Sequence, residues 1–179
     1  MIILNREKAM SKTLMAFTVI FVTFVQVSAV SAQSTKIIKR FQDWVLYSHK
    51  GAPATICFIS ARPREKKPNK FSKKESYFYI SAWPDNGVKA EVSVNIRNEL
   101  QNGSTVTAQI GGARYRLFTK GNKAFVEKPS EEIKLIEAMK RGSFMVVRAT
   151  SRDGIKIVET YSLLGVTSAI NSLRKGCDR

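Results

Sequence analysis

Strict alternation of apolar and polar positions is clearest in the middle of the chain. Over residues 88–97, "VKAEVSVNIR", the apolar positions are Val88, Ala90, Val92, Val94 and Ile96. Successive side chains of a β-strand point to opposite faces, so these five residues are predicted to share one buried face. One buried and one wet face is typical of an antiparallel sheet.

Similar apolar segments recur along the chain and are separated by turn residues. "STVTAQI" and "ARYRLFTK" meet at Gly111-Gly112, "KAFVE" follows Lys120-Gly121-Asn122, and "SFMVVRATS" and "IKIVETYSL" flank Arg152-Asp153-Gly154. Earlier candidate strands cover residues 41–48, 55–60 and 77–83. Such turns join antiparallel strands as hairpins. The spacing predicts a mainly β, antiparallel β-sandwich or barrel.

Helical periodicity replaces the alternation in two places. The first predicted helix is capped by Ser130, ends at Gly142, and buries Ile133, Leu135, Ile136 and Met139. Acidic residues at its start and basic residues at its end complement the helix dipole. The second runs from about Val166 to Lys175, with apolar residues at helical spacing: Val166, Ala169, Ile170 and Leu173. We therefore expect one or two short helices on the sheet.

The first 32 residues have the pattern of a secretory signal peptide. A basic start precedes an apolar run over 13–27, and the tripeptide "VSA" follows twice. The run is shorter than the roughly 20 apolar residues of a membrane span, and no later stretch is long enough to cross a bilayer. We expect cleavage after Ala32, a flexible segment over 33–40, and a single β-sandwich domain over 41–179.

Export determines how the two cysteines are interpreted. Cys57 lies in an early apolar segment and Cys177 follows the last predicted helix. In an oxidising compartment such a pair predicts a disulfide, the alternative being two separately buried thiols. Closing a loop of about 120 residues would stabilise the fold by roughly 4 to 5 kcal/mol. Two cysteines and one histidine are too few for a zinc site, so we predict no metal and no cofactor.

Positive charge is the strongest compositional signal. The formal charge is +16, and loss of three cations and one acid with the signal peptide would leave +14. Such a surface attracts polyanions. Many cations lie in a predicted basic loop, residues 62–74, whose candidate polyanion-binding residues are Arg62, Arg64, Lys66, Lys67, Lys70, Lys73 and Lys74. Three interpretations remain: a solvated loop, a contact for anionic envelope or host-surface polymers, and nucleic-acid binding. The last is disfavoured because the nearby aromatic residues do not alternate with the cations.

An enzymatic function has little support in the sequence. His49 is the sole histidine and is expected in a turn between two strands, while the acidic residues are scattered. Gly111-Gly112 lacks the lysine motif of a phosphate-binding loop. Trp83 begins the turn-forming "WPDNG" and is assigned to the core or its rim rather than to recognition. We predict a non-enzymatic binding protein.

Several segments resemble the invasion-associated locus B family of exported bacterial proteins. They include "TICFISARP", "YFYISAWPDNGVKAEVSVNI", "GGARYRLFTKGNKAFVE" and "TYSLLGVTSAI", with a cysteine close to the end. The resemblance implies an immunoglobulin-like β-sandwich, a periplasmic or outer-envelope location, and an association with host-cell invasion in some members. Cys57 and Cys177 match the early and terminal cysteines of the family. A structural envelope protein without host contact is the alternative, and a hydrolase is less favoured.

Overall fold

The computed structural model describes residues 34–51, 54–68 and 74–176. These residues belong to one compact unit, Ser31–Arg179. The predicted signal peptide, Lys70, Lys73 and Cys177 lie outside the described residues. In the described part of the chain, no helix has both the length and the apolar character needed to cross a membrane.

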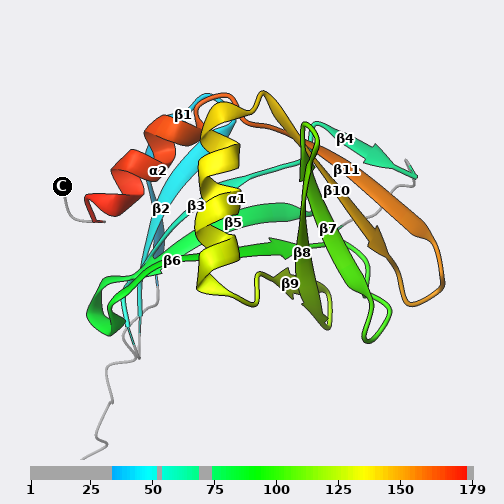
Figure 1. Cartoon of the computed structure of the whole chain (residues 1–179). Helices are drawn as coiled ribbons and strands as arrows, with labels where there is room; N and C mark the ends of the chain where they lie inside the picture. The colour runs from blue at the N-terminus through cyan, green and yellow to red at the C-terminus, as the bar shows by residue number, and fades with distance from the viewer. Residues whose placement is uncertain (1–33, 52–53, 69–73, 177–179) are drawn as a thin grey trace, which may run out of the picture. The chain divides into compact units, whose positions relative to one another are not determined.

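Eleven strands, two α-helices and a short 3-10 helix make up the described residues (Figure 1). In chain order they are β1 (Ser34–Phe41), β2 (Trp44–Lys50), β3 (Ile56–Ala61), β4 (Glu65–Lys67), β5 (Tyr77–Trp83), η1 (Pro84–Asn86), β6 (Val88–Asn95), β7 (Thr105–Ile110), β8 (Ala113–Lys120), β9 (Lys123–Phe125), α1 (Pro129–Arg141), β10 (Phe144–Thr150), β11 (Lys156–Ser162) and α2 (Val166–Arg174). The prediction of a mainly β chain with two short helices is confirmed.

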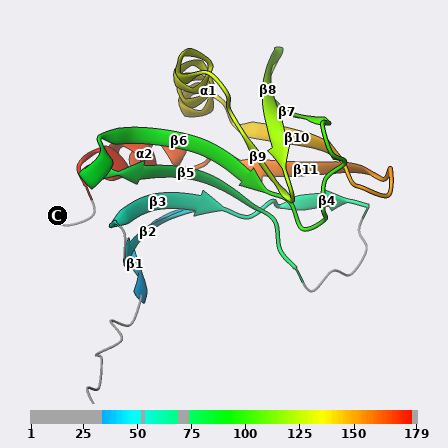
Figure 2. The same ribbon diagram turned by 90° about the horizontal axis from the view of Figure 1, so that it is seen from below.

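The strands form one continuous antiparallel sheet in the order β1-β2-β3-β5-β6-β9-β8-β7-β10-β11-β4. Figure 2 shows β3, β5 and β6 side by side in one half, with β10 and β11 in the other. The inner faces of the two halves pack together. The Trp44 indole nitrogen on β2 donates to the backbone oxygen of Ser162 at 3.0 Å, and the Phe78 and Tyr161 rings meet at 5.8 Å. The sheet therefore turns back on itself to enclose the core of a sandwich.

The two helices pack against the inner side of this sheet. Helix α2 contacts β1, β2, β3 and β5 and buries the four residues predicted for it: Val166, Ala169, Ile170 and Leu173. Helix α1 buries Leu135, Ile136 and Met139, but Ile133 is 63% exposed and its predicted burial is wrong. The predicted Ser130 cap is also wrong, because α1 begins two residues earlier with Lys128 as N-cap and Pro129 at its first position. Proline suits that position because its fixed φ matches a helix.

The structure corrects two segments that the sequence predicts to lack regular structure. A flexible segment is expected over 33–40, but its described residues, 34–40, belong to β1, which pairs with β2 through the tight turn joining Phe41 to Trp44. Residues 65–67 of the predicted basic loop form β4, which pairs with β11. Seven of the eight β1 residues are exposed, so alternation gave no sign of a strand there.

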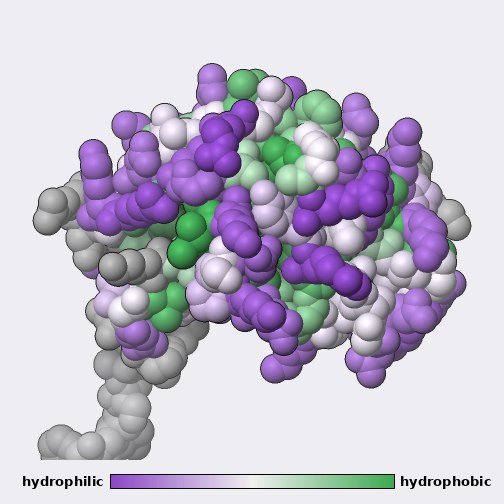
Figure 3. All heavy atoms as spheres, in the orientation of Figure 1, coloured by the Kyte–Doolittle hydropathy of each residue, from purple (hydrophilic) through white to green (hydrophobic). Residues whose placement is uncertain are grey.

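The face that carries α1 is largely hydrophilic, with hydrophobic side chains scattered among the polar ones (Figure 3). Exposed large hydrophobic residues in the described part include Ile133, Phe144 and Leu164. Isolated residues of this kind are normal on protein surfaces and carry no functional argument.

Candidate functional site

Three cations of the predicted basic loop are engaged in local contacts. The Arg62 guanidinium lies 5.2 Å from the centre of the Tyr77 ring, and its Nε donates to the Tyr77 hydroxyl at 3.1 Å. Arg64 Nη2 donates to both carboxylate oxygens of Asp43, at 2.8 and 2.7 Å. Lys66 forms a salt bridge with Glu75.

Two of these contacts lower the pKa of the acidic partner. The Lys66 hydrogen bond lowers the pKa of Glu75, with burial opposing it. Burial raises the pKa of Asp43, but hydrogen bonds from Ser162 and Arg64, with the Arg64 charge, lower it further than burial raises it. Both carboxylates are therefore ionised at neutral pH and offset part of the loop's positive charge.

Strand β4 places another loop cation among cations from distant parts of the chain. Lys67 lies opposite Val158 on β11, and Val158 lies opposite Arg148 on β10. Arg148 lies opposite Thr107 on β7, which in turn lies opposite Arg116 on β8. Directly paired residues share one face of a sheet. We refer to Arg116, Arg148 and Lys67, all exposed, as the cationic row.

The cationic row spans five neighbouring strands. Adjacent strands lie about 4.8 Å apart, so its three cations are spaced roughly 10 Å apart across the sheet. Arg148 Nη1 donates to Gln109 Oε1 at 2.9 Å, which fixes its direction. Arg114 and Lys156 lie on the same outward face, and among the described residues of these five strands Glu65 is the sole acid there.

Of the remaining predicted loop residues, Lys74 is exposed, whereas Lys70 and Lys73 lie outside the described residues. The loop and the cationic row therefore share Lys67. Sequence reasoning missed Arg116 and Arg148, because only the register of β8, β7, β10, β11 and β4 brings them into line with it.

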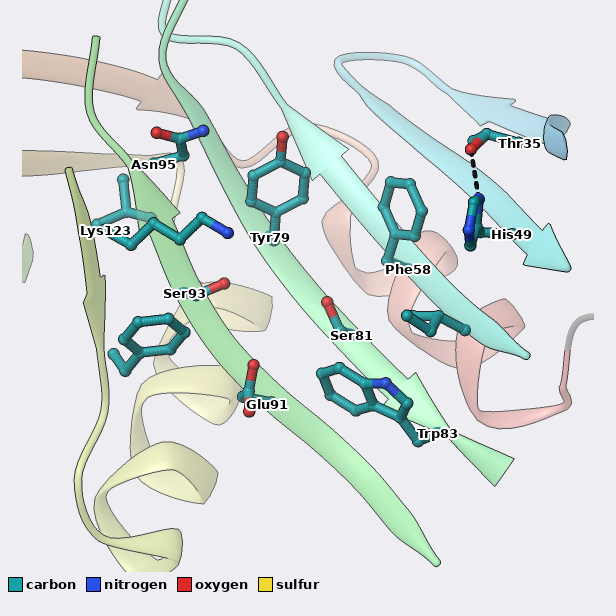
Figure 4. Close-up of a pocket in the computed structure, with 13 residues that line it drawn as sticks. Thr35, His49, Phe58, Tyr79, Ser81, Trp83, Glu91, Ser93, Asn95 and Lys123 are labelled. Carbon is teal, nitrogen blue, oxygen red and sulfur yellow. Dashed lines mark hydrogen bonds between the residues drawn. The ribbon is translucent and has the colours of Figure 1, made fainter. Parts of the chain in front are cut away.

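A second candidate site, the aromatic groove, lies on the outer face of the other half-sheet. It has a cavity volume of about 310 Å³ and receives side chains from β1, β2, β3, β5, β6 and β9. Figure 4 shows these side chains projecting from the sheet face opposite the helices. Its aromatic residues are Phe58, Tyr79, Trp83 and Phe125, and all four are partly exposed.

Alternation along β3 and β5 directs these rings outward. Ile59 and Ile80 point into the core, whereas Phe58 and Tyr79 lie on the opposite face. Phe58 stacks on Tyr47 with ring centres 4.9 Å apart and an interplanar angle of 11°. It meets Tyr79 edge-on at 5.9 Å. These contacts hold the rings in place before any ligand binds.

A β-bulge shapes the end of the groove. Ser81 pairs with Glu91, but Trp83 pairs with Val88, so β6 carries one residue more than β5 over this interval. A bulge re-aims the side chains beside it. Val88 consequently lies opposite Trp83 on the groove face and is 38% exposed, so its predicted place on the buried face is wrong.

Polar groups lie between and around the rings. Burial raises the pKa of Glu91, and the nearby Lys123 charge opposes this effect. His49 lies in β2, not in the expected turn, and its Nδ1 is 2.7 Å from the Thr35 hydroxyl oxygen. Asn95 Oδ1 accepts a hydrogen bond from Asn122 at 2.7 Å.

The described residues contain no group of three or more His, Cys, Asp or Glu side chains that could hold a metal ion. Cys57 lies in β3 and is completely buried in the core beneath α2, and no cysteine in the described part is a free thiol. Because Cys177 lies outside the described residues, the disulfide between Cys57 and Cys177 stays a prediction.

Residues 44–174 match the family described as "Invasion associated locus B (IalB) protein". The chain belongs to the invasion-associated locus B family. Its fold is similar to the crystal structure of invasion associated protein B from Bartonella henselae, with a TM-score of 0.54 and 13% sequence identity. That similarity covers 75% of this chain and 94% of the Bartonella chain. No curated protein matches the sequence.

Proposed function

We propose that this member of the invasion-associated locus B family is an exported, non-enzymatic protein that binds an anionic polymer of the envelope or the host-cell surface. The cationic row is the observation that carries the proposal. Arg116, Arg148 and Lys67 come from three separate segments, yet strand register aligns them on one face. The formal charge of +14 expected after loss of the predicted signal peptide adds a long-range attraction.

Regular spacing suits a polymer better than a single small anion. A chain with repeated sulfate, phosphate or carboxylate groups could contact several of the exposed cations at once. Arginine guanidinium groups bind such oxygens with paired hydrogen bonds, whereas lysine acts as a compact point charge. The side chains are exposed, so each contact is weak and affinity depends on several acting together.

Family membership supports the cellular setting. The family comprises exported proteins, which is consistent with the predicted signal peptide. We infer a periplasmic or outer-envelope location and a part in host-cell contact. In the alternative, a structural envelope protein without host contact, the anionic polymer would belong to the bacterial envelope.

The proposal is tested with heparin, lipopolysaccharide and DNA as probes at two salt concentrations. In the row variant, Lys67→Gln, Arg116→Gln and Arg148→Gln remove three positive charges. We expect heparin or lipopolysaccharide affinity to fall about tenfold or more at low salt. The slope of log affinity against log salt should decrease by roughly 2 to 3, about one per lost contact.

The matched control removes the same charge from the helical side of the molecule: Lys128→Gln, Lys134→Gln and Lys175→Gln, all at exposed positions. Equal loss of binding in both variants would mean that net charge alone attracts polyanions. A third variant, neutralising Lys70, Lys73 and Lys74, measures the rest of the predicted loop. Tighter binding to DNA than to both other polymers would favour the nucleic-acid alternative.

A further inference from the structure

We propose that the aromatic groove is a second, separate binding site and that it takes an uncharged sugar ring of a glycan. The groove combines four partly exposed aromatic side chains with hydroxyl, amide and carboxylate groups in one cavity of about 310 Å³. Convergent polar groups among apolar walls are typical of small-ligand sites.

The partly exposed indole of Trp83 provides a surface for the ring to pack on. Phe58 is engaged by Tyr47 and Tyr79, and Phe125 meets Phe118 at 5.7 Å. Within the described residues, the Trp83 ring forms no contact with another aromatic ring. A pyranose presents an apolar C–H face that packs on such a ring, since the negative face of the π-system attracts the polarised hydrogens.

The polar groups suit the hydroxyl groups at the edge of a sugar ring. Ser81 and Glu91 are directly paired across β5 and β6 beside Trp83. Neither side chain makes a hydrogen bond to another described residue, so both have capacity for a ligand. A partly buried carboxylate accepts strong hydrogen bonds from hydroxyl donors. Figure 4 shows Ser81, Trp83 and Glu91 projecting from the same sheet face.

Other occupants fit these groups less well. A lipid chain would cover Ser81 and Glu91 without supplying donors or acceptors, which is costly for polar groups. An extended peptide gains its affinity from the unpaired backbone of a sheet edge, but Ser81 and Trp83 lie on β5, a strand between β3 and β6. An anionic sugar would meet the Glu91 carboxylate beside Trp83, although Lys123 also lines the cavity. An uncharged ring avoids each of these costs.

Tryptophan fluorescence gives a direct measurement. The chain has two tryptophans, and Trp44 is completely buried in the core. A sugar that packs on Trp83 therefore changes the emission of one residue while Trp44 stays constant. The probes are uncharged oligosaccharides of glucose, of galactose and of N-acetylglucosamine, titrated to millimolar concentration with isothermal calorimetry alongside.

Three variants locate the site. Trp83→Ala should weaken the binding of the responding oligosaccharide by about tenfold or more, the loss of one aromatic stacking contact. Glu91→Gln keeps the shape of the side chain and should weaken binding by a smaller factor. Phe144→Ala is the matched control, because Phe144 is 57% exposed and lies outside the groove, and it should bind as wild type does.

Two results would overturn the proposal: no saturable binding of any uncharged oligosaccharide to wild type, or binding that Trp83→Ala leaves unchanged. The proposal would also be contradicted if the groove bound heparin, an acidic polymer, more tightly than any uncharged oligosaccharide. Such binding would be lost in Trp83→Ala and kept in the row variant. Circular dichroism of each variant verifies that a loss of binding does not come from misfolding. The outcome is independent of the cationic row, which lies on other strands.

Discussion

The most unusual single residue is an acid in the core. Glu159 on β11 is completely buried. Ser76 Oγ donates to its Oε1 at 2.6 Å, and the Tyr161 hydroxyl donates to its Oε2 at 2.9 Å. Burial raises the pKa of Glu159, and these two hydrogen bonds and the charges of Arg97 and Lys66 oppose the increase without cancelling it.

This direction sets a pH dependence of stability. A folded-state pKa above the unfolded value means that the folded protein binds more protons, so the stabilising contribution is present below the unfolded pKa and is lost as pH rises through the folded pKa. Glu159→Gln removes the titration. Compared with the variant, wild type should lose relative stability as pH rises from about 4 toward neutral.

Urea unfolding of both proteins across that pH range measures the difference in unfolding free energy. A difference that is constant, or that grows in favour of wild type with rising pH, would contradict the prediction. Because both proteins share every other titrating group, the difference isolates the contribution of Glu159.

For single residues, the sequence predicts which side chains are buried better than which side chains line a binding site. Alternation placed Val92, Val94 and Ile96 in the core correctly. It failed at Val88 because the bulge shifts the alternation by one residue, and a bulge depends on pairing with β5. The sequence around Trp83 predicts the strand that positions it, but not the groove, which is lined by residues from six strands.

Among the elements, those with one buried face were predicted and those without one were missed. The predicted segment 77–83 coincides with β5, and "ARYRLFTK" with β8. Strands β1 and β4 are largely exposed on both faces, so nothing in their side-chain pattern separates them from loops. Helix α2 was predicted from its four buried residues, whereas the start of α1 depended on proline geometry.

The junction between β11 and α2 requires a glycine. Gly165 has φ of +86°, and a Cβ at this position would lie 2.1 Å from the backbone oxygen of Phe41. Gly165→Ala should reduce the unfolding free energy by about 3 kcal/mol or more, since the left-handed backbone costs about 1–2 kcal/mol and the clash adds about 1–3 kcal/mol.

The control is Gly154→Ala, because Gly154 has φ of +77° with no atom within 4 Å of an added Cβ. It should lose about 1–2 kcal/mol from the backbone alone. Thermal and urea unfolding of both variants separate the two contributions. Equal losses would mean that the β1–β2 turn moves aside without cost.

At the scale of the whole molecule, the predicted disulfide should contribute to the free energy of unfolding. Helix α2 packs on β3, where Cys57 is buried, and the chain continues from the end of α2 toward Cys177. A bridge would fasten the last helix to the sheet. Cys177→Ser should lower the unfolding free energy by about 2–5 kcal/mol.

Intact mass under non-reducing and reducing conditions provides the direct measurement. The oxidised protein should be lighter by two hydrogen atoms, and Cys177→Ser should abolish that difference. Two reactive thiols in the folded, oxidised protein would contradict the bridge, and the variant would then be nearly as stable as wild type.

Sequence established the class of the whole molecule but not its surfaces. Net charge and the 62–74 cluster predicted an attraction for polyanions. Three of that cluster's cations are engaged by Tyr77, Asp43 and Glu75, and the exposed Lys67 aligns with two arginines far away in sequence. Both candidate sites depend on which distant strands become neighbours, and the pattern of apolar and polar residues within one segment does not specify its neighbour.

The exposed strand β1 has a consequence for association between copies of the protein. It ends the sheet, so one side of its backbone has no partner strand among residues 34–51, 54–68 and 74–176, a geometry that favours edge-to-edge pairing. Lys36, Lys39 and Arg40 lie on this strand, and like charges on two such edges would repel each other. Added salt screens that repulsion. An increase in salt concentration that weakens polyanion binding would therefore also promote self-association of the protein.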